Sequence, residues 1–496
     1  MTFDRRRLLQ TTGALALGFG ALPPSGLAAA PMAAMSGRTG TPIGKADHTI
    51  EIGNGLLALG SETAVSTKLY NNQFPGPLLR LQEGKPVTVD VRNNTDSPEQ
   101  LHWHGQTLPA AVDGAAEEGT PYIPPHSTRR IAFTPGPSGF RFYHSHLTAG
   151  TDLSVGLYSG QAGPVFIAPK HDPGAYDREV FVTFKEFGPS FTRMEMPDNM
   201  LAPAPINPAL RDAALKALDA STRRGLPQAY DVSYQFYTIN GRMLGEGPPI
   251  AVKAGERVLF HVLNASATES HSLALPGHAF RVVALDGNPV PRPAAVPVLW
   301  LGPAERVSAI VDMRTPGKWI MGDIDDDARG HGAGIVVEYA KSGGKPVWTK
   351  PADARWDYRL FGAARSSSPP PDETITMTFA ANPGARNGFD EFTINGVAFS
   401  MDRMDPLFDL SLGRRYRLHM RNATDDAHPV HLHRHTFELT GIAGRPTAGV
   451  RKDVVMIGGF QEMTVDFLAD QPGLSLFHCH MQHHMDFGFM ALIHCR

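Results

Sequence analysis

Cysteine is almost missing from this chain of 496 residues, which contains only Cys479 and Cys495. A secreted protein held together by disulfides would usually carry more, so we expect at least one of the two thiols to have another task. A large excess of charge of one sign is missing as well, because the formal net charge is −3. Binding to nucleic acid or to an anionic membrane surface is therefore not predicted. No apolar run is long enough to cross a membrane.

The N-terminus has the parts of an export signal. Asp4-Arg5-Arg6-Arg7-Leu8-Leu9-Gln10 resembles the twin-arginine pattern, a short apolar run follows between Gly13 and Leu22, and Leu27-Ala28-Ala29-Ala30-Pro31 offers a cleavage site. The alternative is a disordered basic tail. We expect residues 1–34 to be a twin-arginine signal peptide and mobile N-terminus, and the protein to reach the periplasm through the twin-arginine export machinery.

One pattern of residues occurs three times along the chain. Each copy begins at an aromatic residue before a turn, at Tyr70, Tyr237 and Phe392, and continues into an alternation of apolar and polar residues such as Val87-Thr88-Val89. A period of two indicates half-buried strands. With 50 Gly and 42 Pro to form turns between many short strands, the pattern favours an all-β protein built from Greek-key sandwiches.

The repeats predict where the domains lie. We expect a first domain at residues 46–170, a second at 171–345 and a third at 373–496, with a linker at 346–372. The Ala- and Leu-rich segment 207–224 does not fit a strand, and we predict that it forms a surface helix inserted in the second domain.

The 21 histidines are concentrated in short motifs. Random placement would give roughly one His-x-His, whereas five occur: His102-Trp103-His104, His144-Ser145-His146, His431-Leu432-His433, His433-Arg434-His435 and His478-Cys479-His480. On a strand, residues i and i+2 point to the same face, so each pair projects two imidazoles into one space. Two pairs in the first domain and two in the third offer more imidazoles than one metal ion can use, which predicts a cluster.

Cys479 indicates a second metal site. It lies between His478 and His480, so its sulfur is expected to point to the opposite face of the strand. With His428 and His484 it completes a set of one cysteine and two histidines, which is typical of a blue copper site. The backbone of residues 478–480 would join the two sites, on the order of 10 Å apart.

These motifs resemble the four copper motifs of the multicopper oxidases, the laccase-like enzymes. The matching stretches are His102-Trp103-His104-Gly105, His144-Ser145-His146, His428-Pro429-Val430-His431-Leu432-His433 and His478-Cys479-His480-x-x-x-His484. The resemblance extends from residue 46 to the C-terminus. It implies three cupredoxin-like Greek-key β-sandwich domains and four coppers per chain, namely one type 1, one type 2 and two type 3.

Carried over residue by residue, the resemblance implies a ligand set for each copper. Type 1 copper would be bound by His428, Cys479 and His484, and type 2 copper by His102 and His431. The type 3 pair would be bound by six histidines: His104, His144, His146, His433, His478 and His480. The alternatives for these residues are histidines satisfied within the core, or a zinc site.

The middle domain lacks a comparable set. It has His271-Ser272-Leu273 and the acidic run Asp323–Asp327 where ligands would lie. We therefore expect a copper-free spacer that shapes the substrate face.

The neighbour of the blue copper along its axis is expected to be apolar. In the family this is the residue ten positions after the cysteine; here it is Phe489, which cannot coordinate, with Met490 next to it. We expect a three-coordinate site of higher potential. A one-residue shift that brings in Met490 is the alternative.

An acid is expected near the cluster, because reduction of dioxygen to water consumes protons. Asp113 lies eleven residues after His102 and matches an acid that bacterial members of the family use to relay protons. An ordinary turn aspartate is the alternative. A second family acid is replaced by Met485, and whether the next residue, Asp486, substitutes for it stays open.

Three further residues fit no ligand position. His435 and His483 are expected to lie around the ligands or on the surface. Cys495 is expected to be unpaired, and the alternative is a disulfide with Cys479 that would remove the thiolate from the blue site.

The resemblance implies an oxidase that takes electrons singly from a donor and passes them to dioxygen. We expect the donor to be a phenol or an aromatic amine. The alternative is a periplasmic cuprous oxidase in copper tolerance, since Cu(I) is also a possible donor and such enzymes often carry a Met-rich insert. The small groups Met194, Met196, Met200 and Met401, Met404 do not form one, and core positions are expected for them.

Two other classes of protein are alternatives. A copper-free cupredoxin protein of cell division would lack the ligand set that this chain retains. A copper nitrite reductase would be shorter and would lack the paired His-x-His motifs.

Overall fold

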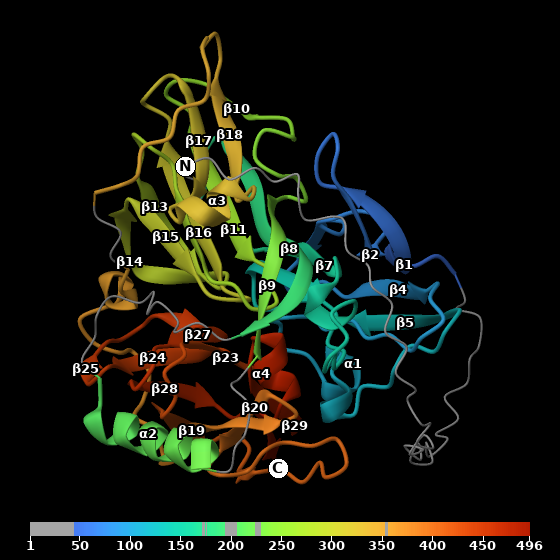
Figure 1. The fold of residues 1–496 in the computed structure, drawn as a ribbon, viewed down its shortest axis with the longest axis vertical. Coiled ribbons are helices and arrows are strands. Elements are labelled where there is room, and N and C mark those ends of the chain that lie inside the picture. Colours follow the sequence, from blue (N-terminus) through green and yellow to red (C-terminus); the bar gives the residue numbers. More distant parts are fainter. Residues whose placement is uncertain (1–43, 171–173, 175, 194–205, 224–229, 353–355) are drawn as a thin grey trace, which may run out of the picture. The chain divides into compact units, whose positions relative to one another are not determined.

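The structure, a computed structural model, describes residues 44–170, 174, 176–193, 206–223, 230–352 and 356–496. The prediction of an all-β protein is confirmed, because strands dominate the described residues (Figure 1). The predicted signal peptide lies outside the described residues, and so do Met194, Met196 and Met200. Among the described residues, no helix combines the length and the apolar character needed to cross a membrane.

The first part of the chain builds a four-stranded sheet of order β2-β1-β4-β5 and a three-stranded sheet of order β3-β7-β6. The predicted alternation is visible in β4, where Val87, Val89 and Val91 are buried in one core cluster. The elements are β1 (His48–Ala58), β2 (Ala64–Tyr70), β3 (Leu79–Gln82), β4 (Val87–Asn93), α1 (Ala110–Asp113), η1 (Ala116–Glu118), β5 (Ser127–Phe133), β6 (Gly139–His144), η2 (Gly156–Tyr158) and β7 (Ala162–Ala168).

The middle part builds a six-stranded sheet of order β14-β13-β16-β11-β8-β9 and a five-stranded sheet of order β10-β18-β17-β12-β15. The predicted helix is α2, which packs against β19 of the last part (Figure 1). The elements are β8 (Arg178–Arg193), α2 (Pro208–Arg223), β9 (Tyr230–Ile239), β10 (Ile250–Val252), β11 (Arg257–Asn264), β12 (His271–Ala274), β13 (Phe280–Leu285), β14 (Asn288–Val296), β15 (Val298–Leu301), β16 (Arg306–Asp312), β17 (Lys318–Asp323), α3 (Asp326–Gly330) and β18 (Gly334–Tyr339).

The last part builds a seven-stranded sheet that includes β20-β19-β22-β28-β24-β25, with β26 paired to β24, and a five-stranded sheet of order β21-β30-β29-β23-β27. The elements are η3 (Tyr358–Phe361), β19 (Glu373–Arg386), β20 (Phe389–Ile394), β21 (Phe408–Leu410), β22 (Arg415–Asn422), β23 (His428–Leu432), β24 (Phe437–Ile442), β25 (Arg445–Pro446), β26 (Arg451–Lys452), β27 (Val454–Ile457), β28 (Glu462–Leu468), β29 (Gly473–Cys479), α4 (Gln482–Asp486) and β30 (Met490–Cys495).

The three parts share a pairing pattern. Each contains two parallel pairs, β1 with β4 and β3 with β7, then β8 with β11 and β10 with β18, then β19 with β22 and β21 with β30. The repeat seen in the sequence therefore has a counterpart in strand topology. The boundaries expected between domains stay predictions.

Candidate metal centre

Four chain segments bring the His-x-His pairs together. His102 and His144 pair in an antiparallel bridge with backbone hydrogen bonds of 2.8 and 3.1 Å. In the last part, β23 and β29 are antiparallel neighbours, and His431 lies opposite His478. The first histidine of each pair thus lies in a strand or bridge, and the second lies just beyond it. The two histidines of each pair point to the same side, as the alternation of side chains along a strand predicts, although each pair lies at the end of a strand.

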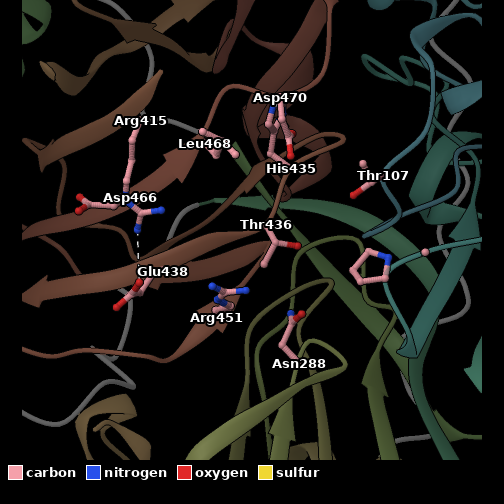
Figure 2. A pocket seen from close by; sticks show the side chains of 12 residues that line it. Thr107, Asn288, Arg415, His435, Thr436, Glu438, Arg451, Asp466, Leu468 and Asp470 are labelled. Atoms are coloured by element: carbon pink, nitrogen blue, oxygen red, sulfur yellow. Dashed lines mark hydrogen bonds and ion pairs between the residues drawn. The ribbon is translucent and has the colours of Figure 1, made fainter. Parts of the chain in front are cut away.

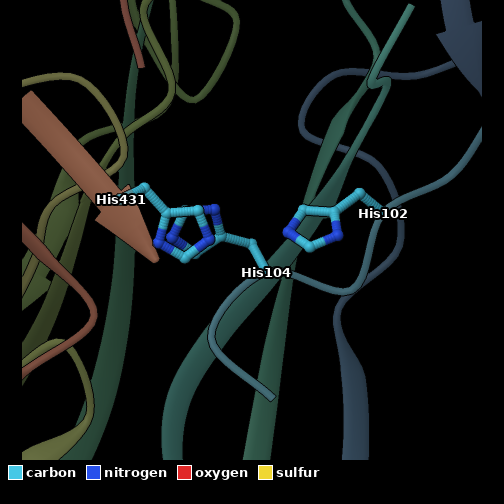
Figure 3. A group of neighbouring side chains, drawn as sticks. All are labelled: His102, His104 and His431. Atoms are coloured by element: carbon cyan, nitrogen blue, oxygen red, sulfur yellow. The ribbon is translucent and has the colours of Figure 1, made fainter. Parts of the chain in front are cut away.

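The eight paired histidines are all buried, with at most 2% of any residue exposed. In Figure 3 the rings of His104 and His431 lie face to face, with centroids 3.8 Å apart, and His102 lies beside them. The ring nitrogens form three groups in which the possible ligand atoms lie within 4.8 Å of one another: His102, His104 and His431; His104, His144 and His480; and His146, His433 and His478.

Four of these rings, those of His102, His146, His431 and His480, have a buried nitrogen without a hydrogen-bond partner in the described part of the chain. The Nδ1 atoms of His431 and His478 are anchored on backbone carbonyl oxygens at 2.7 and 2.8 Å. The Nε2 atoms of His102, His146 and His431 are buried and have no hydrogen-bond partner among the described residues. Buried nitrogens without partners are rare and call for an explanation. Anchoring one ring nitrogen while freeing the other is how proteins present histidine to a metal.

Burial also selects the protonation state that binds metal. It lowers the pKa of seven of the eight rings well below the ordinary value for histidine, namely those of His104, His144, His146, His431, His433, His478 and His480. Neutral imidazoles facing one another are the donor set that copper and similar ions accept.

The second predicted group assembles on the other face of β29. The Sγ atom of Cys479 lies 3.7 Å from Nδ1 of His428 and 3.5 Å from Nδ1 of His484, and the two Nδ1 atoms are 3.1 Å apart. All three residues are buried. Burial raises the pKa of the Cys479 thiol, so a bound cation is needed to hold it as a thiolate.

Two alternatives at this group are settled by geometry. Cys479 and Cys495 are both free, so the disulfide does not form. The ring of Phe489 lies 4.8 Å from the ring of His428, whereas Met490 packs in another cluster with Leu476 and Leu492. The apolar neighbour expected from the sequence is therefore the residue in contact with the group.

Asp113 lies between two of the rings. Its Oδ2 atom is 3.0 Å from Nδ1 of both His102 and His433, and the side chain is fully buried. Two acids that the sequence did not single out lie nearby in η1. Glu118 is 3.4 Å from Nδ1 of His433, and Glu117 is 3.6 Å from Nδ1 of His146.

Burial raises the pKa of three acids in this region, Glu117, Glu118 and Asp486. The pKa of Glu117 rises to about 7, and that of Glu118 rises well above its ordinary value because of burial and the nearby Asp113. Burial likewise raises the pKa of Asp486 to about 7. Asp486 accepts hydrogen bonds from the backbone of Ala149 and Gly150 and from Gln482, so it ties a loop of the first part to α4.

His435 and His483 are buried rather than on the surface, each 5% exposed. His435 lines a polar pocket of about 490 Å³, where its Nε2 faces Asp470 at 4.0 Å (Figure 2). His483 faces Asp231 at 3.6 Å. Neither belongs to a group of clustered donors.

The middle part has a different arrangement at the position expected from the sequence. His271 lies between Glu186 and Asp323, with Nε2 and Nδ1 at 2.5 and 2.8 Å from their carboxylate oxygens. Burial alone would lower its pKa, but the two carboxylates outweigh burial and raise it to about 10. Within the described portion of residues 171–345, no three donors come close enough to hold a metal ion.

Comparisons with known proteins match this geometry. Three family models described as multicopper oxidase match residues 53–172, 212–340 and 364–494. The multicopper oxidase MmcO of Mycobacterium tuberculosis is 29% identical over 442 residues, which cover 86% of this chain and 82% of the relative. Laccase-1 of Cryptococcus neoformans is 25% identical, with 90% of this chain and 80% of the laccase covered.

A solved structure shares the fold. The multi-copper oxidase from Pseudomonas thermotolerans has a TM-score of 0.66 at 23% identity, and the match covers 91% of this chain and 100% of that one. The predicted fold class of cupredoxin-like Greek-key sandwiches is confirmed by this likeness.

Proposed function

Because this chain belongs to the multicopper oxidase family, we propose that it is a laccase-like enzyme that oxidises phenols or aromatic amines and reduces dioxygen to water. Four electrons from four one-electron donors and four protons convert one dioxygen into two waters. The observation that best supports this is the strand end at residues 478–480, which contributes Cys479 to the group with His428 and His484, and His478 and His480 to two groups of the histidine cluster.

We assign the copper ligands as the resemblance to the family implies. His428, Cys479 and His484 would hold type 1 copper, and His102 and His431 would hold type 2 copper. The type 3 pair would be held by His104, His144, His146, His433, His478 and His480. When bound, copper supplies one-electron redox chemistry at the thiolate site and a multi-electron site for dioxygen. The unpartnered ring nitrogens and the buried thiol support this assignment.

The residues between the two groups form a short covalent connection. Cys479 is bonded through the backbone to both His478 and His480, and its carbonyl oxygen also accepts a hydrogen bond from Nδ1 of His478 at 2.8 Å. A rigid connection keeps the distance between the two groups constant. Because both neighbours are strand residues or directly follow the strand, neither group can shift without the other.

Asp113 is proposed to relay protons to the cluster. Its carboxylate contacts His102 and His433 at 3.0 Å, which places an acid beside the rings that surround the reaction space. The same contacts orient both rings.

Export to the periplasm by the twin-arginine route is part of the proposal. It is supported by the order of basic, apolar and small residues in the first 34 positions. A protein that must enclose buried metal sites would benefit from a route that accepts folded proteins.

Oxygen uptake by the copper-loaded protein with a phenol, an aromatic amine and Cu(I) tests the proposal. We expect uptake with the organic donors, one dioxygen consumed per four electrons, and no accumulation of hydrogen peroxide. A fully loaded protein that is active only with Cu(I) would replace the organic donor by the cuprous ion. Peroxide as the product would contradict the proposed reduction to water.

A further inference from the structure

A buried group of charged residues lies behind the histidine cluster and includes residues of the middle part of the chain. We propose that Arg306 of this middle part is a positioning residue, which holds Asp453 in the orientation that presents His104 and His431 to the cluster. The inference rests on the proposed function, from which the ligand roles of the two histidines are taken. It gives the middle part a role at the reaction centre instead of that of a spacer.

Arg306 binds Asp453 through both terminal nitrogens of its guanidinium. Nη1 donates to Oδ1 and Nη2 donates to Oδ2, each at 2.6 Å. Such a two-point contact fixes the plane of the carboxylate as well as its place. Both side chains are fully buried, so water does not compete for these hydrogen bonds.

Asp453 in turn contacts two proposed ligands from different parts of the chain. Its Oδ1 atom lies 3.1 Å from Nε2 of His104, and its backbone carbonyl oxygen lies 2.7 Å from Nδ1 of His431. A carboxylate only accepts hydrogen bonds, so Nε2 of His104 carries the proton and Nδ1 is left bare. That Nδ1 atom is the one that faces the cluster, 3.3 Å from Nε2 of His144.

The contact between Arg306 and Asp453 belongs to a larger charge-balanced network. Nη1 of Arg141 donates to Asp453 at 3.1 Å, and Lys452 pairs with Asp286 and Glu305 at 2.9 and 3.0 Å. Three cations therefore face three anions, and the residues come from all three parts: Arg141 from the first, Asp286, Glu305 and Arg306 from the middle, and Lys452 and Asp453 from the last.

Stability alone does not account for such a network. Buried ion pairs can often be replaced by well-packed apolar residues without loss of stability. Burial alone would lower the pKa of Arg306, yet Asp453 and Asp286 raise it, so the guanidinium stays protonated. A fixed charge beside His104 orients that ring, which an apolar side chain cannot do.

Gly105, the last residue of the His102-Trp103-His104-Gly105 motif, supports the inference independently. Its φ is +77°, and a Cβ atom there would lie 2.6 Å from Oδ2 of Asp453 and 2.7 Å from Nη2 of Arg306. Any side chain would push into the two-point contact. The motif that supplies two ligands thus also leaves the space that the Arg306–Asp453 pair occupies.

Three substitutions test the proposal through copper binding and spectroscopy. Arg306→Met should lower the affinity of the histidine cluster for copper about 10- to 100-fold and change the electron paramagnetic resonance signal of the type 2 copper. The blue absorption from the Cys479 site should stay unchanged. Arg306→Lys keeps the positive charge but cannot make the two-point contact. Its copper affinity should lie between those of Arg306→Met and the wild type. Asp453→Asn should have the same effects as Arg306→Met on copper affinity and on the type 2 signal.

A measurement on the metal-free protein gives a second readout. Nitrogen-15 NMR of the histidine side chains should show His104 protonated at Nε2 in the wild type. In Arg306→Met a mixture of Nε2 and Nδ1 forms is expected, because the carboxylate is no longer held against the ring. A role limited to folding would leave this tautomer unchanged.

Arg306→Met leaves Asp453 buried without its main partner and can prevent folding. The double variant Arg306→Met/Asp453→Asn removes one charge of each sign and keeps the network neutral. It should fold, keep the blue site and still bind copper weakly at the cluster. Arg417→Gln is the matched control, because Arg417 holds Asp466 by a similar two-point contact of 2.7 and 3.0 Å outside the ligand groups. It should bind copper as the wild type does.

A double variant with wild-type copper affinity, type 2 signal and His104 tautomer would overturn the positioning role. Failure of the proposed function looks different. In that case the wild-type protein itself would not bind copper at the cluster, or would bind it and show no oxidase activity.

Discussion

The middle and last parts of the chain use the same strand positions for opposite chemistry. β12 begins at His271 and β23 at His428, and two residues later Leu273 pairs with Asp323 while Val430 pairs with Cys479. The register is the same, but an aspartate stands in one part where the other has a cysteine. Five residues further on, α3 carries Ala328 and α4 carries His484.

The difference lies in what each buried imidazole can bond to. The ring of His271 has a carboxylate at each nitrogen, so a proton satisfies both contacts, and its pKa rises to about 10. The ring of His428 faces a thiol and another imidazole, and burial lowers its pKa to about 3. The comparison teaches that a proton satisfies both ring nitrogens of a buried histidine that lies between two acids. A buried histidine among neutral donors instead requires a metal ion to satisfy its ring nitrogens.

Cys479→Ser should have the largest effect, because it removes the thiolate of the last part and the proposed entry point for electrons. We expect complete loss of the blue absorption and of donor oxidation, with copper retained at the histidine cluster. Absorption spectra, copper content and oxygen uptake check this. Cys495→Ser is the matched control and should keep all three. A Cys479→Ser protein with full activity would contradict the comparison.

Removing the middle imidazole should cost stability rather than copper. His271→Gln leaves Glu186 and Asp323 buried without a cation, which should lower the free energy of unfolding by about 3–5 kcal/mol. Copper content should not change. His428→Gln should do the reverse: the blue site is lost, and the metal-free protein loses about 1 kcal/mol through the bond to Thr424. Chemical denaturation and metal analysis of both variants measure the contrast. Loss of copper in His271→Gln would remove the distinction between the two parts.

The pH dependence of unfolding should sharpen the same contrast. Since the pKa of His271 is about 10 when folded and near 6.5 when unfolded, its contribution is complete below pH 6.5 and is lost as the pH rises towards 10. Within that range the loss should be about 1.4 kcal/mol per pH unit.

The surrounding acids set the rest of the profile. Although burial alone would raise the pKa of Glu186, His271 lowers it below 4.5, so its contribution is lost at acidic pH. Burial raises the pKa of Glu269 from 4.5 to about 8, so its contribution is lost as the pH rises from 4.5 to about 8, which overlaps the lower part of the His271 range. Denaturation of metal-free wild type and His271→Gln between pH 6 and 10 isolates the histidine. Parallel curves would show that His271 does not titrate as expected.

Phe489→Met should have the smallest effect. A thioether beside the Cys479 group offers copper a weak axial ligand, which should lower the potential of the blue site. We expect a shift on the order of 59 mV, which for one electron is about tenfold in equilibrium. Redox titration measures it, and copper content should stay the same. An unchanged potential would place the new side chain outside the site.

Much of the site could be predicted because its signals are local. Strand periodicity requires only neighbouring residues, so the direction of His478, Cys479 and His480 follows from the sequence alone. Asp113, eleven residues after His102, is predicted because it matches an acid of the family that the copper motifs resemble. The repeated pattern likewise predicted the sheets, because each strand and turn is encoded within a few residues.

The rest depends on contacts between distant residues. Asp453 lies 349 positions from His104, and Arg451-Lys452-Asp453 reads like an exposed charged turn. Glu117 and Glu118 likewise resemble solvated acids until the fold buries them against the histidines. The packing of α2 against β19 has no signal in the periodicity of either segment, because it is fixed by the way that the middle and last parts meet.

Anomalous X-ray scattering at the copper absorption edge, from crystals of the copper-loaded protein, tests the central claim most directly. We predict one peak among His428, Cys479 and His484, further peaks within the eight paired histidines, and none between Glu186, His271 and Asp323. A copper peak beside His271, or no peak beside Cys479 in an active protein, would contradict the account.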